Sequence, residues 1–199
     1  MNATELTSAS LLERLRDQAD PADWQRLTAI YRSWLVGWLR RHGMGDADAE
    51  DLVQDILVVV LRELPFFQHN RKAGAFRAWL RTIAVHRLRD ALRARGYRPT
   101  ATGDSAFLDQ LEQLEDPASV LSKQWELEHD RHIVGRLLAM IEPDFQPATW
   151  QAFRGVMLDG LTPRETATAL GISVNAVLLA KSRILARLRQ EARGLVEED

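Results

Sequence analysis

The sequence of 199 residues contains no cysteine. It therefore has no thiol nucleophile, no cysteine-ligated zinc or iron–sulfur site and no disulfide, and nothing in it suggests an oxidising compartment. Its longest wholly aliphatic run, residues 56–61, is far shorter than the roughly 20 residues that span a bilayer. Residues 1–5 lack the basic and then apolar order of a signal peptide. We therefore expect a cytoplasmic protein.

The chain also lacks an excess of charge of either sign, since 26 Lys and Arg face 28 Asp and Glu, for a formal charge of −2. That total argues against a nucleic-acid binder, but the charge is unevenly distributed. The local charge is +8 over residues 71–98, −7 over 99–130 and +4 over 181–194. Two basic blocks around an acidic one predict a polyanionic partner that is contacted at two places, and ordinary solvated helix faces are the alternative.

Alternating β-type patterns are scarce, whereas the helix formers Leu, Ala, Arg and Glu are abundant. Apolar periodicity predicts helices near 22–42, 47–64, 74–95, 119–141, 147–158, 163–170 and 174–193. Residues 96–117 are rich in Pro, Thr, Gly and Asp and show no sustained apolar period, which is typical of a linker. We therefore expect an all-α protein of two small helical bundles joined by a flexible linker, with domains at 1–95 and 119–199 and an acidic linker at 96–118.

The helix expected at 47–64 carries an apolar stripe and an acidic outer face. The stripe consists of Val53, Ile56, Leu57, Val60, Leu61 and Leu64. The outer face carries Asp51, Gln54, Asp55 and Val58, with Asp48 and Glu50 in the first turn. The acids suit the positive end of the helix dipole, which is a sufficient structural explanation. The functional alternative is a docking surface for a basic partner helix, and a carboxylate metal or catalytic site lacks a matching histidine or base.

The helix expected at 74–95 combines basic and aromatic residues. Its inner side is predicted to hold Phe76, Leu80, Ile83, Ala84, Leu88 and Ala91. Its outer side is predicted to hold Arg81, Thr82, Val85, His86, Arg89 and Arg93, with Trp79 at the boundary. Cations neutralise phosphates and an aromatic edge can stack on an unpaired base, so the pattern suits a melted strand. A Trp at helical spacing is also common in a protein core, which is the alternative interpretation.

Residues 162–193 match the order of a helix-turn-helix. Thr162 and Pro163 are suited to start a short helix, Gly171 to end it and Ser173 to cap a second helix. The outward residues of the second helix are expected to be Asn175, Leu179, Ser182, Arg183 and Ala186, with Lys181, Arg187 and Arg189 nearer its flanks. Such a helix reads base edges in the major groove and grips phosphates. An ordinary helical hairpin remains the structural alternative.

Taken together, the two halves resemble extracytoplasmic-function sigma factors of bacterial RNA polymerase, in the sigma-70 family. Residues 48–55 (DAEDLVQD), 76–84 (FRAWLRTIA) and 88–90 (LRD) resemble the second region of that family. Residues 161–177 (LTPRETATALGISVNAV) resemble its fourth region. The resemblance covers the chain from about residue 22 to 193 and implies a factor that binds core RNA polymerase, recognises promoter DNA, promotes initiation and catalyses no reaction itself.

The resemblance implies specific roles. Contacts with the clamp helices of the polymerase's largest subunit would be made by Glu50, Asp51, Gln54 and Asp55. The minus-ten element would be opened and held by Trp79, Arg81, His86, Arg89 and Arg93. The minus-thirty-five element would be read by Arg164, Ser173, Asn175, Lys181 and Arg183. No cofactor or metal is implied, and the partners would be core polymerase, promoter DNA and, as a further possibility, an anti-sigma factor.

The chain departs from the family pattern at two places. His86 stands where the family commonly has Asn, and residues 176–180 (AVLLA) stand where it has Thr-Val-Lys-Ser-Arg, which removes two cations near the start of the recognition helix. Outward Leu179 could touch a thymine methyl or another part of the polymerase, or be an ordinary exposed leucine.

Two other interpretations compete with the sigma factor. Glu126, His129 and His132 fall at i, i+3 and i+6 of one helix and could form part of a metal site, but no further histidine is clustered with them. A stand-alone helix-turn-helix regulator with an N-terminal protein-interaction module is the closer rival. The runs at 48–51 and 76–80 argue against it, because a repressor needs neither a polymerase-binding face nor a strand-opening helix.

Overall fold

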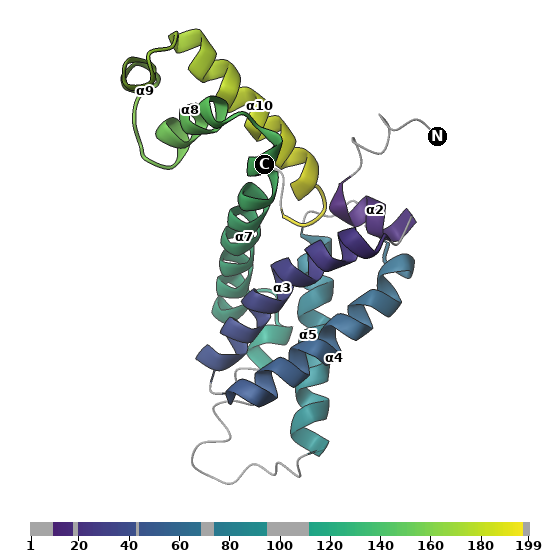
Figure 1. Cartoon of the computed structure of the whole chain (residues 1–199). Helices are drawn as coiled ribbons and strands as arrows, with labels where there is room; N and C mark the ends of the chain where they lie inside the picture. Colours follow the sequence, from purple (N-terminus) through teal and green to yellow (C-terminus); the bar gives the residue numbers. More distant parts are fainter. Residues whose placement is uncertain (1–9, 18–19, 43, 69–73, 95–111, 197–199) are drawn as a thin grey trace.

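The computed structural model describes residues 10–17, 20–42, 44–68, 74–94 and 112–196 (Figure 1). Its helices are α2 (Leu11–Asp17), α3 (Pro21–Arg41), α4 (Asp46–Glu63), η1 (Leu64–Phe66), α5 (Ala75–Ala94), α7 (Val120–Ile141), η2 (Glu142–Asp144), α8 (Pro147–Met157), α9 (Pro163–Leu170) and α10 (Val174–Ala192). No strand occurs in these described ranges, where the β-type pairing is one isolated bridge between Arg193 and Val196. The predicted all-α class is therefore confirmed, and each predicted helix is found with ends within two residues of those expected. Helix α2 was not predicted.

The helices form two groups that α7 connects (Figure 1). Helices α2 to α5 form the first group, called here the N-terminal bundle, in which α4 packs between α3 and α5. Helices α8 to α10 form the second group, called here the C-terminal bundle, in which α10 contacts α7, α8 and α9. Among the described residues, no single helix is long and apolar enough to cross a membrane, and only α9 and α10 taken as a bent pair meet that test.

Helix α7 contributes to the core of the N-terminal bundle. Trp125 is buried and packs edge-on against Trp34 and Trp38 of α3, with ring centroids 4.4 and 4.8 Å apart. Ile133 and Leu137, further along α7, belong to the same buried cluster. Aromatic side chains bury large apolar areas, so this contact fixes the N-terminal half of α7 against α3. The division into domains at 1–95 and 119–199 remains a prediction.

The acidic linker predicted at 96–118 lies mostly outside the described residues. Its described end forms a helical turn over 112–115, from which Leu114 is buried in the N-terminal core. Leu114 lines a small internal pocket together with Leu88 of α5 and Trp125 of α7. This end of the predicted linker is therefore packed against the bundle.

A buried cluster of charges joins the two ends of the described chain. Arg14 of α2 lies 2.8 Å from Asp23 of α3 and 3.3 Å from Glu191 of α10. The Glu191 side chain is only 2% exposed and also pairs with Arg187. Burial alone would raise the pKa of the Asp23 carboxyl, but hydrogen bonds from Arg14 and Arg26 lower it overall. The cluster holds the end of α10 against the N-terminal bundle.

Candidate nucleic-acid and protein interfaces

Helices α9 and α10 form the predicted helix-turn-helix. Thr162 caps α9 in a reciprocal capping box, in which its hydroxyl accepts a hydrogen bond from the Glu165 amide at 3.2 Å and the Glu165 carboxylate accepts one from the Thr162 amide at 2.8 Å. Hydrogen bonds from the Thr162 hydroxyl and amide lower the pKa of the Glu165 carboxyl. The turn holds Gly171 at a φ of 65°, which glycine adopts without strain, and Ser173 caps α10. The two axes bend by 108°, within the range of DNA-binding helix-turn-helix pairs.

The core beneath this pair is small and closely packed. Ala152 of α8, Ala167 of α9, and Val177 and Ala180 of α10 are buried together. Gly155 lets α8 approach α9, because a Cβ at that position would lie 2.9 Å from the Thr166 methyl carbon. Small residues at these contacts thus let α8, α9 and α10 pack closely together.

The residues predicted to meet the minus-thirty-five element lie on the surface of this unit. Arg164, Ser173, Asn175 and Arg183 are exposed, and Lys181 is half-buried. The whole outward face predicted for α10 is exposed, and Val177 and Ile184 are buried on its other side. The predicted face of the recognition helix is therefore confirmed, whereas the DNA contacts remain predictions.

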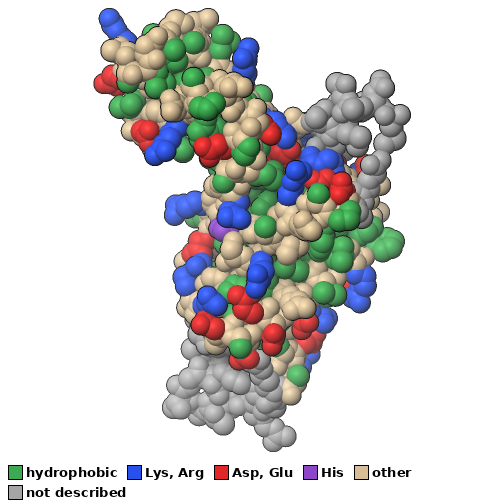
Figure 2. Space-filling model, in the orientation of Figure 1, with side chains coloured by type: hydrophobic (Ala, Val, Ile, Leu, Met, Phe, Trp, Pro, Cys, Tyr) green, Lys and Arg blue, Asp and Glu red, His purple; other side chains and the backbone are tan. Residues whose placement is uncertain are grey.

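The acidic face of α4 borders a groove between α3 and α4. Asp51, Gln54 and Asp55 are exposed, and Glu50 is half-buried in ion pairs with Arg32 at 2.9 Å and Arg40 at 3.8 Å. The groove has a volume of about 320 Å³. Its lining includes Trp24, Asp51, Gln54, Leu57, Val58 and Leu61. Figure 2 shows acidic and basic side chains interspersed over the visible face of the N-terminal bundle, rather than one extended basic area.

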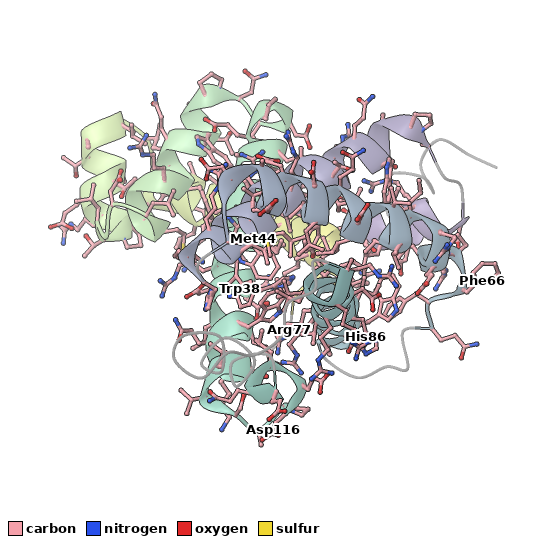
Figure 3. The ribbon with its side chains drawn as sticks, turned by 90° about the horizontal axis from the view of Figure 1, so that it is seen from below. Trp38, Met44, Phe66, Arg77, His86 and Asp116 are labelled. Carbon is pink, nitrogen blue, oxygen red and sulfur yellow. The ribbon has the colours of Figure 1, made fainter. Side chains whose placement is uncertain are left out.

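One prediction for α4 is wrong. Leu61 was expected in the buried stripe, but 45% of its surface is exposed at the edge of this groove, beside the 54% exposed Val58. Position 61 lies at the border of the apolar arc, and no element among the described residues covers it. Phe66 of η1 is 82% exposed and projects from the bundle (Figure 3). Phe66 and Trp24 were not among the predicted site residues. For Phe66 the available signal was an aromatic residue directly after the acidic helix.

Helix α5 places four of its five predicted minus-ten residues at or near the surface. His86 and Arg93 are exposed, and Arg89 is half-buried and pairs with Glu115. Trp79 is half-buried, as its boundary position predicted, and its ring centroid lies 4.8 Å from that of Phe67. A cavity of about 390 Å³ lies between α5 and the described end of the predicted linker. Its lining includes Trp79, Thr82, His86, Glu115 and Pro117.

Arg81 and Val85 were predicted on the outer face of α5, and the structure contradicts this placement. Both are buried, at 5% and 2% exposure. Arg81 donates a hydrogen bond of 3.0 Å to Glu126 of α7, and neighbouring Arg77 lies 2.5 Å from Asp130. Helix α7 therefore covers one flank of the basic helix with its own carboxylates. The prediction treated α5 alone and could not include a helix that begins 26 residues after it ends.

The three residues considered for a metal site face different partners. His129 is buried, with Nε2 3.1 Å from the Tyr31 hydroxyl and Nδ1 2.8 Å from Asp130. His132 Nε2 lies 3.0 Å from the Ile30 carbonyl oxygen, and Glu126 pairs with arginines. Burial lowers the pKa of both histidines. No group of three or more potential metal ligands is assembled anywhere in the described part of the chain.

Comparison with known proteins identifies the family. A protein-family model described as Sigma-70 region 2 matches residues 27–97. The ECF RNA polymerase sigma factor ShbA of Streptomyces griseus is 33% identical over 147 residues, which cover 73% of each chain. The chain belongs to the ECF RNA polymerase sigma factors. The predicted function of an RNA polymerase sigma factor is thereby confirmed, and the alternative of a stand-alone regulator is not favoured.

Other relatives of this sigma factor extend over more of its length. The ECF RNA polymerase sigma-E factor of Escherichia coli K12 is 27% identical over 187 residues, or 90% of each chain. The ECF RNA polymerase sigma factor SigD of Mycobacterium tuberculosis is 28% identical over 164 residues, or 78% of this chain and 67% of the relative. The match to region 2 runs from within α3 through α4 and α5. The acidic face of α4 and the basic helix α5 of this sigma factor thus both lie within the matched region.

Proposed function

We propose that this sigma factor binds bacterial core RNA polymerase through the groove edge of α4. The contact residues are Glu50, Asp51, Gln54 and Asp55. Exposed carboxylates beside the apolar side chains of Val58 and Leu61 suit a basic amphipathic helix, because such a helix offers both cations and apolar contact. The clamp helices of the polymerase's largest subunit are the proposed partner. RNA synthesis belongs to the polymerase, and the sigma factor catalyses no reaction.

The proposed role of α5 is to hold the opened minus-ten element. Trp79 offers a half-exposed aromatic ring for stacking, and His86, Arg89 and Arg93 follow it along the helix. Arg81 belongs to this surface only if α7 moves away from α5, because its guanidinium is paired with Glu126 of α7. We therefore include separation of α7 from α5 in the proposed mechanism.

The proposed role of α10 is to read the minus-thirty-five element in the major groove. Arg164, Ser173 and Asn175 lie at the start of the two helices, where recognition helices meet base edges and phosphates. Lys181 and Arg183 follow on the next turns of α10 and would contact the backbone. The proposed domains are residues 1–95 and 119–199, joined by 96–118, in a cytoplasmic protein that meets the polymerase.

The observation that carries this proposal is the placement of the exposed acidic face of α4 and an aromatic-basic helix within the region-2 match, on the same chain as a capped helix-turn-helix. The test is to transcribe fragments of the encoding genome with core polymerase, with and without the sigma factor, and to map the 5′ ends of the RNA. New starts should share two sequence elements at fixed distances upstream. An unchanged set of 5′ ends would overturn the proposal.

A further inference from the structure

Two adjacent leucines are exposed on the recognition helix. Leu178 and Leu179 of α10 are 47% and 48% exposed. They lie on a stretch without any acid, since Asp and Glu are absent between Val174 and Gln190, whereas Lys181, Arg183, Arg187 and Arg189 fall within it. When such a helix lies in the major groove, an apolar side chain is matched only by an apolar group of the DNA.

The neighbours of the two leucines differ. Leu179 lies between Asn175 and Arg183 at i−4 and i+4, and all three are exposed. At a rise of 1.5 Å per residue these side chains follow one another at intervals of about 6 Å along a single stripe. Leu178 instead follows Val174 and lies about 100° around the axis. Along the i±4 rows, Leu179 is therefore flanked on both sides by groups that hydrogen-bond to bases or phosphates, whereas Leu178 has Val174 on one side.

The major groove offers one apolar group to such a side chain, the C5-methyl of thymine. Other base edges present donors and acceptors, which a leucine would desolvate without replacing their hydrogen bonds. Asn175, one turn earlier, has the amide that pairs with adenine N6 and N7. The stripe is thus suited to A·T base pairs.

We propose that Leu179 is a specificity-determining residue that contacts a thymine methyl group in the minus-thirty-five element. This inference rests on the proposed role of α10 in the major groove. It assigns the readout at this position to van der Waals contact rather than to a hydrogen bond.

The test uses the full chain with core polymerase. An upstream element is first selected with the wild-type protein from promoters that are randomised in that region. Each thymine of the selected element is then replaced in turn by deoxyuridine, which removes only the methyl group, and the initiation rate is measured. At one thymine, we expect the replacement to lower the initiation rate of the wild type about three- to five-fold. This is the effect expected for the loss of one buried methyl group.

The matched variants are L179A and L178A, which shorten adjacent leucines of equal exposure. The deoxyuridine effect at that thymine should vanish in L179A and persist in L178A. The inference is overturned if every deoxyuridine is neutral for the wild type, or if L179A keeps the full effect, as it would were Leu179 in contact with a protein partner. Failure of the proposed function would be distinct, because no promoter in the randomised pool would then support initiation.

Discussion

Arg81 on α5 donates a hydrogen bond of 3.0 Å to Glu126 on α7, across 45 residues of sequence. The Arg81 side chain is only 6% exposed, and Glu126 also lies 3.4 Å from Arg77. The Glu126 carboxylate of α7 therefore neutralises two arginines of the basic block at residues 71–98 within the molecule itself. We expect these cations to become available to DNA only when α7 leaves α5.

Replacement of Glu126 tests that expectation. E126Q keeps the side-chain shape and removes the charge that faces Arg81, so the free sigma factor should bind a single-stranded oligonucleotide more tightly. The free energy of unfolding should fall by about 1–3 kcal/mol, since a buried cation loses its charged acceptor. Fluorescence anisotropy and urea titration measure the two effects.

The control for this variant is E128Q. Glu128 lies on the same helix with similar exposure, 29% against 28%, but pairs with Arg41 of α3. The E128Q variant should bind the single-stranded oligonucleotide as tightly as the wild type. Equal gains in binding for both variants would mean that net charge, rather than the cover over α5, governs the affinity.

The groove edge of α4 gives a second prediction. Combining D51A with Q54K removes one acid and adds a cation on the exposed face, so the affinity for core polymerase should fall at least ten-fold, about 1.4 kcal/mol, with an unchanged unfolding transition. E63A is the control, because Glu63 lies on the same helix about 120° away from Asp51 around the axis. An unaltered affinity of the double variant would remove Asp51 and Gln54 from the interface.

The cations of α5 give a third prediction. In the polymerase complex, the double variant R89A/R93A should bind promoter DNA with a weaker salt dependence. Each lost contact with a single-strand phosphate lowers the slope of log affinity against log salt concentration by about 0.7, so two contacts lower it by about 1.4. R62A removes an exposed arginine from α4 and should leave the slope as it is. Wild-type salt dependence in the R89A/R93A variant would make these arginines an ordinary solvated face.

The helix-turn-helix could be predicted in detail from the sequence because its signals are local. Thr162, Gly171 and Ser173 act on the backbone within a few residues, and the structure shows each in its predicted capping or turn role. The outward face of α10 was likewise predictable, since one neighbouring bundle buries one side of it.

The outer face of α5 was predicted less well because its surroundings are set by distant segments. Arg81 and Val85 have the spacing of surface residues relative to Phe76 and Leu80, yet Glu126 and Leu114 cover that side. No periodicity within α5 carries information about a helix that folds back over it. For the same reason, the pairing of Arg14 with Glu191, 177 residues apart, could not be predicted.

The buried histidine of α7 gives a prediction of pH dependence. Burial lowers the pKa of His129 below its ordinary value of 6.5, despite the opposing effect of Asp130. The unfolded chain therefore binds protons below about pH 6.5 that the folded chain does not, and the free energy of unfolding should decrease between pH 7.5 and 5.0. The pKa of Asp23 is also lowered, and its contribution to the free energy of unfolding is lost only at more acidic pH.

Urea titration at several pH values measures this dependence. H129Q should flatten it, leaving the part that comes from His132, whose pKa burial also lowers. H86Q, at an exposed position on α5, should retain the wild-type slope. A slope in H129Q as steep as that of the wild type would contradict the assignment to His129.

We expect this chain to confer promoter-specific initiation on bacterial core RNA polymerase. The most direct measurement is initiation by purified core polymerase on one linear promoter fragment from the encoding genome, alone and after addition of the sigma factor. We predict RNA from a single start site only when the sigma factor is present, and loss of that RNA with the D51A/Q54K variant. A chain that shifts the duplex fragment by itself but never yields RNA with core polymerase would not act as a sigma factor.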